Sequence, residues 1–205
     1  MRIKTLEPSP HVQGRVLVTL EDGSFYKITE QEILDFSLAP GVDLSGEELE
    51  RLKAAAGASQ ARLLAAQIIG HKPLSRSELI RKLRDKGCRT QDAQSAADWL
   101  TEIGALDESA YAAMLVRHYG AMRYGPAKVR EELRTRGVPR ELWEEALAQL
   151  PPAEESISAF LDKKLSDRPI DRQELHRLAA ALQRRGFAWG DISACLCRYG
   201  ADPEE

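Results

Sequence analysis

The first thirty residues alternate between apolar and polar positions in the manner of β-strands. RVLVTL at 15–20 places every second side chain on an apolar face, and an Asp-Gly turn follows at 21–24. FYKI at 25–28 then returns, so the pattern predicts a β-hairpin. Residues 2–6 can add one more strand beside it.

The next segment changes to a helical period. Thr29 and Ser45 are each followed three residues later by Glu, the capping box that opens many helices. The helix from Thr29 is expected to end near Pro40–Gly41. The helix from Ser45 is expected to end at a break or kink at Gly57, before a second helical run at 59–69.

The rest of the chain is predicted to be almost wholly helical, because capping boxes, an N1 proline and glycine stops divide it into amphipathic segments. Residues 201–205 are expected to be frayed. The start and stop signals delimit helices at Ser75 to Gly87, Thr90 to Ile103, Asp107 to Tyr119, Gly125-Pro126 to Gly137, Pro139 to Pro151-Pro152, Asp171 to Gly186, and Trp189 to Tyr199.

Three of these segments are copies of one another. Residues 77–88, 127–138 and 176–187 align without gaps and place a glycine at the same position, with a period of about 50 residues. Apolar residues recur at offsets of −26, −8, −4, +1, +6, +10 and +13 from the glycine, and the last three offsets share one helix face. The glycines and the residues four before them are Gly87, Gly137, Gly186, Leu83, Leu133 and Leu182.

The repeat predicts a mainly α fold. Each unit consists of three helices with a glycine turn between the second and third, and stacked units can share a continuous core. We therefore expect tandem three-helix, helix-turn-helix-like repeats in an elongated array, preceded by a small N-terminal β-hairpin or sheet and a helix. The expected divisions are a leader at 1–58 and repeats at 59–105, 106–151 and 152–205.

The repeats resemble the RecX family. The first unit shows a Ser/Arg loop, Glu-Leu and then Lys-Gly within 71–88, although His71-Lys72-Pro73 stands where another arginine is expected. The second shows Tyr111-Ala112, Val116-Arg117, Gly125-Pro126 and Arg136-Gly137-Val138. The third shows Arg184-Arg185-Gly186-Phe187 followed by Ile192. The resemblance covers residues 59–200, and its specificity lies in the order of the three units.

This resemblance implies a non-enzymatic, cytoplasmic regulator that binds the RecA–DNA filament and inhibits its ATPase, strand exchange and filament growth. A monomer is expected, with weak contact to single- or double-stranded DNA left open. Two alternatives remain. Helices joined by a glycine turn also occur in helix-turn-helix DNA-binding proteins, and helical arrays serve as scaffolds for many other partners.

Composition and charge restrict these alternatives. The chain is 43% hydrophobic and 30% charged, with a net charge of −3. Residues 59–105 carry 8 basic and 5 acidic side chains, whereas residues 1–58 carry 6 and 10. This local excess is weaker than the basic footprint of a typical DNA-binding domain. The longest apolar runs are far shorter than the about 20 residues that cross a bilayer, and the N-terminus lacks the apolar core of a secretory signal.

No motif for chemistry is visible in the sequence. There is no Ser/His/Asp set, Walker A sequence or glycine-rich phosphate loop, so we expect no enzyme and no cofactor. Cys195 and Cys197 have no second Cys/His cluster beside them, which makes a metal site improbable. With Cys88 they form an odd, sparse set typical of a reducing cytosol. Cys195 falls on an apolar face, where a buried thiol is expected.

Partner contacts are predicted mainly from cations near the repeated glycines. Lysines and arginines in a last helical turn also favour the helix dipole, so this alternative explanation stays open. Tyr124 is expected to be exposed, whereas Trp143 is expected to pack in a core. The candidate contacts are Arg76, Arg81, Lys82, Arg84, Lys86, Arg89, Tyr124, Lys128, Arg134, Arg136, Arg184 and Arg185.

Overall fold

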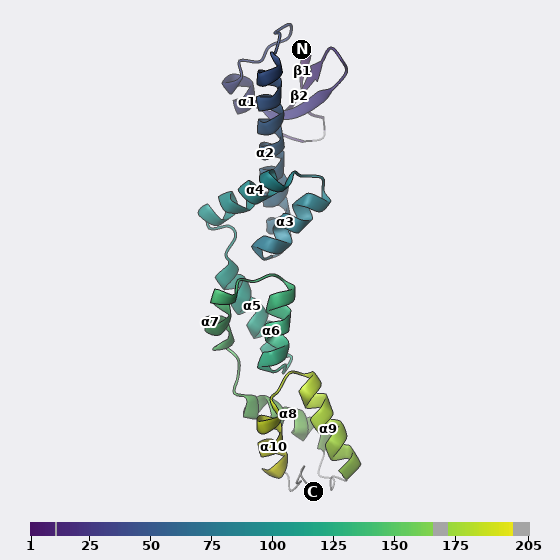
Figure 1. Ribbon diagram of the computed structural model, residues 1–205, viewed down its shortest axis with the longest axis vertical. Coiled ribbons are helices and arrows are strands. Elements are labelled where there is room, and N and C mark those ends of the chain that lie inside the picture. The colour runs from purple at the N-terminus through teal and green to yellow at the C-terminus, as the bar shows by residue number, and fades with distance from the viewer. Residues whose placement is uncertain (11, 166–171, 199–205) are drawn as a thin grey trace. The chain divides into compact units, whose positions relative to one another are not determined.

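The structure is a computed structural model that describes residues 1–10, 12–165 and 172–198 (Figure 1). The chain divides into two compact units, Met1–Leu106 and Asp107–Glu205. The described residues are mainly helical, with one small sheet near the N-terminus, as the sequence predicts.

The leader is built on a three-stranded antiparallel sheet in the order β1-β2-β3. Its strands are β1 (Ile3–Pro8), β2 (Arg15–Leu20) and β3 (Phe25–Thr29). The predicted hairpin and its additional strand are therefore confirmed. Val18 and Ile28 are fully buried, because alternate residues of each strand face the helices that cover the sheet.

The first helix, α1 (Glu30–Asp35), opens with the predicted capping box at Thr29. It ends well before Pro40, so the longer helix expected there is wrong. Ser37 adopts a positive φ of 47°, and the amide of Leu38 donates to the carbonyl oxygen of Ile33 at 2.9 Å. This turn reverses the chain and buries Leu38 in the core of the leader.

The second helix, α2 (Gly46–His71), runs through Gly57 without interruption, so the predicted break is wrong. A glycine inside a helix lowers its stability, but here the absence of a side chain makes room for a tertiary contact. A Cβ atom at position 57 would lie 2.9 Å from the Asp92 Oδ2 atom and 3.2 Å from a guanidinium nitrogen of Arg89. The glycine allows another helix to cross α2 closely.

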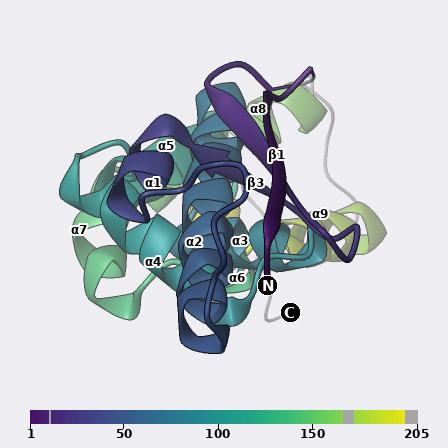
Figure 2. The same ribbon diagram turned by 90° about the horizontal axis from the view of Figure 1, so that it is seen from above.

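The leader and the first repeat share α2. Leu52 packs in the core of the leader and Ala65 in the core of the repeat, so the expected division after residue 58 lies within one helix. The guanidinium of Arg15 donates to both the side-chain and the main-chain oxygen of Ser59, each at 2.6 Å. Figures 1 and 2 show α1 and β1 on opposite sides of α2.

The first repeat adds α3 (Arg76–Asp85) and α4 (Thr90–Glu102) to the second half of α2. The capping box at Ser75 is present as predicted. Thr90 is the first residue of α4 and not its cap, which is Arg89 and makes no side-chain capping bond. Alanines of α2 and α4 permit the two helices to pack closely in this core.

Two more three-helix repeats form the second compact unit. Their elements are α5 (Glu108–Ala121), α6 (Pro126–Thr135), η1 (Arg140–Leu142), α7 (Trp143–Leu147), α8 (Ala153–Leu165), α9 (Arg172–Arg184) and α10 (Trp189–Arg198). Asp107 caps α5 through the amide of Ala110, and Pro126 begins α6, as predicted. The predicted cap at Asp171, the helix end at Tyr199 and the frayed residues 201–205 lie outside the described residues.

The three repeats contain the same turn. Gly87, Gly137 and Gly186 have φ values of 87°, 68° and 89°, a region that residues with a Cβ rarely occupy. In each turn the amide N–H of the residue after the glycine donates to the carbonyl oxygen of the leucine that lies four residues before the glycine. These bonds join Cys88 to Leu83 at 3.0 Å, Val138 to Leu133 at 3.0 Å and Phe187 to Leu182 at 3.3 Å. The structure thus confirms the internal repeat.

Candidate functional site

The described residues contain no cluster of three or more potential metal ligands. None of their helices combines the length and the apolar character that a membrane span requires. Cys195 is buried as expected, with 1% of its surface exposed. Trp143 is half-buried against the core of its repeat and donates its indole N–H to the carbonyl oxygen of Val138 at 3.0 Å. Apart from Tyr124, the contact residues predicted from the sequence are all lysines and arginines.

Two of the candidate cations in the first repeat form ion pairs. Arg76 lies 2.5 Å from Asp98, which connects the start of α3 to α4. Arg89 lies 2.7 Å from Asp92, a carboxylate that is almost completely buried. Both contacts stabilise the packing of the repeat, and they reduce the charge that these arginines offer to a partner.

Four other cations of the first repeat remain available. Within the described part of the chain, the side chains of Arg81, Lys82, Arg84 and Lys86 make no ion pair or hydrogen bond, and all but the half-buried Lys82 are exposed. They occupy the second half of α3 and its C-terminal cap. This end of the first repeat therefore carries positive charge that the protein itself does not neutralise.

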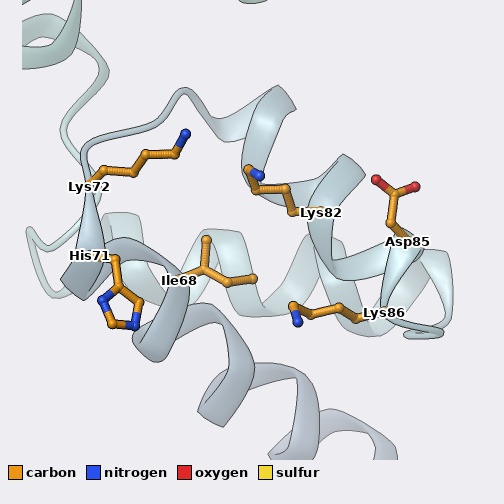
Figure 3. A pocket seen from close by; sticks show the side chains of 6 residues that line it. All are labelled: Ile68, His71, Lys72, Lys82, Asp85 and Lys86. Carbon is orange, nitrogen blue, oxygen red and sulfur yellow. The ribbon is translucent and has the colours of Figure 1, made fainter.

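Lys82 and Lys86 also line a hollow between the ends of α2 and α3 (Figure 3). It has a volume of about 370 Å³, and its other lining residues are Ile68, His71, Lys72 and Asp85. Lys72 follows α2 directly in an extended conformation. The sequence prediction did not include Lys72, although a basic residue directly after a helix was a signal that could have indicated it.

In the second repeat the candidate cations differ in their surroundings. The ammonium of Lys128 lies 2.9 Å from Glu131 and 3.4 Å from Glu132. Arg136 is half-buried and donates to the hydroxyl of Tyr111 at 3.3 Å. Arg134 is exposed in the last turn of α6, and its side chain makes no ion pair or hydrogen bond to another described residue.

Arg185 and Tyr124 contact each other between the second and third repeats. The Arg185 guanidinium lies 5.2 Å from the centre of the Tyr124 ring and 5.1 Å from that of Phe160. It also donates to the carbonyl oxygens of Met122, at 2.9 Å, and Arg123, at 3.2 Å. Tyr124 is half-buried and not exposed as expected, because this cation packs on its ring. Arg184, the neighbouring residue, is exposed.

The backbones of these two repeats also meet directly. The amide of Gly125 donates to the carbonyl oxygen of Arg185 at 2.8 Å, and the amide of Ala127 to that of Gly186 at 3.1 Å. A Cβ atom at Gly125 would lie 2.7 Å from the Phe187 amide nitrogen. Only glycine permits this approach, so the contact holds the third repeat against the start of α6.

The candidate contacts therefore separate into two groups. Arg76, Arg89, Lys128, Arg136, Arg185 and Tyr124 make contacts within the protein. The other six lie in or beside the last turns of α3, α6 and α9, and the described residues provide their side chains with no hydrogen-bonding or ion-pair partner. These six are Arg81, Lys82, Arg84, Lys86, Arg134 and Arg184.

Known families and proteins resemble this chain in sequence. Residues 107–147 match the family model described as RecX, second three-helix domain, and residues 153–196 match RecX, third three-helix domain. The chain is 33% identical over 143 residues to the regulatory protein RecX of Pseudomonas syringae pv. tomato, covering 69% of this chain and 92% of that protein. It is 27% identical over 197 residues to the regulatory protein RecX of Lactobacillus delbrueckii subsp. bulgaricus, covering 92% and 71%.

Solved structures show the same fold. A crystal structure of regulatory protein RecX superposes with a TM-score of 0.72 at 20% identity, covering 95% of this chain and 98% of that one. The crystal structure of RecX from Lactobacillus salivarius superposes with a TM-score of 0.64 at 17% identity, covering 70% and 97%. The agreement in fold therefore extends over nearly the whole chain.

Proposed function

Because the chain belongs to the RecX family of regulatory proteins, we propose that it regulates the RecA recombinase in the cytoplasm. In this proposal it binds the RecA–DNA filament and inhibits the filament's ATPase, strand exchange and growth. The observation that carries the proposal is the repetition of exposed cations at the end of the second helix of each repeat. Arg84 and Arg134 lie three residues before the repeat glycines, in the last turns of α3 and α6, whereas the third repeat has Gln183 at that position and Arg184 one residue later, in the last turn of α9.

A repeated surface suits a polymeric partner. A filament presents the same surface on each protomer, so a protein with several similar repeats can make several similar contacts along it. Each contact can be weak while the total affinity is high, because the first contact raises the effective concentration of the next. The direct hydrogen bonds of Gly125 and Ala127 to the third repeat support this, since they keep two of the repeats in register.

The exposed cations are suited to the first, electrostatic recognition of the filament. Charges at the rim of an interface increase the association rate and determine which partners are accepted, and they contribute less to the final affinity. The side chains of Arg81, Arg84 and Lys86 are exposed, and no described residue offers them an acceptor that would compete with a partner. An acidic surface of a protein filament would therefore attract this end of the first repeat.

The test is a titration of the RecA ATPase on single-stranded DNA with the purified protein. We expect ATP hydrolysis to fall as the protein is added. The double variant Arg84→Glu, Lys86→Glu should need about tenfold more protein for the same inhibition, because two exposed ion pairs are each worth up to about 1 kcal/mol and the reversed charges repel an acidic surface.

A matched control is Lys163→Glu, Lys164→Glu on α8, where both lysines are exposed. It changes the net charge by the same amount and should inhibit normally. Both variants should keep the helical circular dichroism spectrum. Unchanged inhibition by the Arg84, Lys86 variant would contradict the assigned surface, and no effect of the unaltered protein on the ATPase would contradict the proposed function itself.

A further inference from the structure

A cavity of about 610 Å³ lies in the first compact unit, between α1 and one face of α2. Arg15 at the start of β2 and Trp99 of α4 also line it. Arg15 and Glu32 are charged, yet only 7% and 8% of their surfaces are exposed. Burying a charged side chain is costly unless its hydrogen-bonding groups find partners. The partners of these two residues therefore decide what the cavity can bind.

The two buried charges are held close together without forming an ion pair with each other. The hydroxyl of Ser59 lies between them. It accepts a hydrogen bond from the guanidinium of Arg15 at 2.6 Å and donates to Oε2 of Glu32 at 3.3 Å. Because both charged groups contact one hydroxyl, they lie within the span of a single small molecule.

Each of these charges keeps hydrogen-bonding groups that no described residue satisfies. Oε2 of Glu32 accepts from the amide of Thr29 at 2.6 Å, from its hydroxyl at 3.0 Å and from Ser59, whereas no described residue donates to Oε1. Arg15 donates one N–H from each terminal nitrogen to Ser59, and no described residue accepts from the others. Buried groups left open in this way are normally satisfied by water or by a ligand.

The burial of Glu32 is not required by its position in a helix. Glu32 is the third residue of α1 and completes a capping box with Thr29, and Glu48 completes the same motif with Ser45 at the start of α2. Glu48 makes its capping bond at 2.8 Å while it is exposed to solvent. The capping role therefore does not explain why the Glu32 carboxylate lies in the wall of a cavity.

The rest of the lining is neutral overall and mostly apolar. Asp35 and Arg62 add one charge of each sign, so the four charged residues of the lining sum to zero. Such a lining does not select a simple cation or anion, and it favours a ligand without net charge that has an apolar part. The apolar lining residues are Phe36, Ala55, Ala58, Leu63, Ala66 and Trp99.

We infer that this cavity binds a free α-amino acid with a large apolar side chain. The ammonium group donates to Oε1 of Glu32, and the carboxylate accepts from the open N–H groups of Arg15. Hydrogen bonds between ionised groups are shorter and stronger than those between neutral groups, and a zwitterion supplies one for each buried charge. The apolar side chain packs along α2, and the volume is within the range of cavities that hold small organic ligands.

A flat uncharged ring, such as a nucleobase, fits these surroundings less well. Its edge offers dipoles and no opposite charge to Arg15 and Glu32. The two aromatic rings of the lining also already contact cations. The guanidinium of Arg62 lies 5.9 Å from the centre of the Trp99 ring, and that of Arg51 lies 6.0 Å from the centre of the Phe36 ring.

The experiment adds L-leucine to the full-length, ¹⁵N-labelled protein and follows the indole N–H signals by nuclear magnetic resonance. The chain has three tryptophans, at positions 99, 143 and 189, and only Trp99 lines the cavity. We expect a saturable shift of the Trp99 signal, which the variant Trp99→Phe identifies, and unchanged signals from Trp143 and Trp189. N-acetyl-leucine, without the ammonium, and leucinamide, without the carboxylate, should each bind at least about tenfold more weakly.

The variant Glu32→Gln tests the carboxylate without removing the helix cap, because glutamine also completes a capping box. It should bind leucine at least about tenfold more weakly and should lose the preference for leucine over N-acetyl-leucine. The matched control is Glu48→Gln, which makes the same change in the exposed capping box and should bind leucine normally. Equal binding by Glu32→Gln and Glu48→Gln would overturn the inference.

Three further outcomes would also refute it. No saturable shift of the Trp99 signal would mean that the cavity holds only water. Equal binding of leucine and leucinamide would remove the role of Arg15 and assign the cavity to the N-terminal residue of a peptide. Tighter binding of adenosine than of leucine would assign it to a nucleobase. All of these measurements are made without the recombinase, so they do not depend on whether the protein inhibits it.

Discussion

Gly125 and Gly186 lie at one close backbone contact, where a side chain on Gly125 would displace the backbone at Gly186 and a side chain on Gly186 would displace Lys128 at the start of α6. A Cβ atom at Gly125 would lie 2.7 Å from the amide nitrogen after Gly186, and a Cβ at Gly186 would lie 2.8 Å from the Cβ of Lys128. Two turns that are 61 residues apart in the printed sequence thus form one contact. The second and third repeats are joined by their backbones, and this contact determines the first prediction.

Replacing Gly186 with alanine should destabilise the second compact unit strongly. The change imposes a left-handed strain of about 1–2 kcal/mol and an overlap with α6 that costs about 1–3 kcal/mol more. Gly87→Ala is the control, because Gly87 has the same positive φ but no atom within 4 Å of its added Cβ. Urea unfolding followed by circular dichroism would measure the free energy of unfolding of both variants. Equal losses of stability would show that the contact between the repeats contributes nothing.

Arg185→Ala should lower the free energy of unfolding by about 2 kcal/mol, because it removes a cation between two rings and two bonds to carbonyl oxygens. Arg184→Ala, at the exposed neighbouring position, should change it by less than about 0.5 kcal/mol. Thermal unfolding of the two variants side by side would check this difference. A loss at Arg184 as large as at Arg185 would refute the assignment of Arg185 to the junction.

Two glycines of α2 should respond in opposite ways to alanine. Gly70 has open space around it, so Gly70→Ala should stabilise the helix by up to about 1 kcal/mol. Gly57→Ala should instead destabilise the protein, since the new methyl group would lie 2.9 Å from Asp92 and disturb its pair with Arg89. Chemical denaturation gives the sign of each change, and a stabilising Gly57→Ala would show that α4 can move away at little cost.

Burial, together with the nearby charge of Asp92, raises the pKa of the Cys88 thiol. The thiolate is the reactive form, so at a pH just below the ordinary thiol pKa, Cys88 should react with iodoacetamide more slowly than the exposed Cys197. The raised pKa also means that the unfolded chain loses this proton first as pH rises. Cys88 should therefore lower stability above the ordinary thiol pKa and have no such effect below it.

Mass spectrometry of partly alkylated protein, after proteolysis, would measure the two rates. Urea-denatured protein is the control, in which Cys88 and Cys197 should react at similar rates. Faster labelling of Cys88 than of Cys197 in the folded protein would contradict the expected burial effect.

The sequence by itself determined the three repeats, the positions of their turns and most of the helix starts. These features are local, because a capping box at Ser75 or Ser45 satisfies amides within three residues. The turns at Gly87, Gly137 and Gly186 likewise depend on a positive φ and on a leucine four residues earlier. Such signals can be found without knowledge of what packs against them.

Only the tertiary structure decided which of the candidate cations stay free for a partner. Arg76 donates to the carboxylate of Asp98, which is 22 residues away in the sequence. Arg185 donates to the carbonyl oxygen of Met122, which is 63 residues away. Distant contacts also explain the glycine at position 57, which lies against Asp92 of α4, and place Lys72 and Lys82 at one hollow. The physical reason is that the energy of a charge or a glycine depends on its neighbours in space, and these belong to other helices.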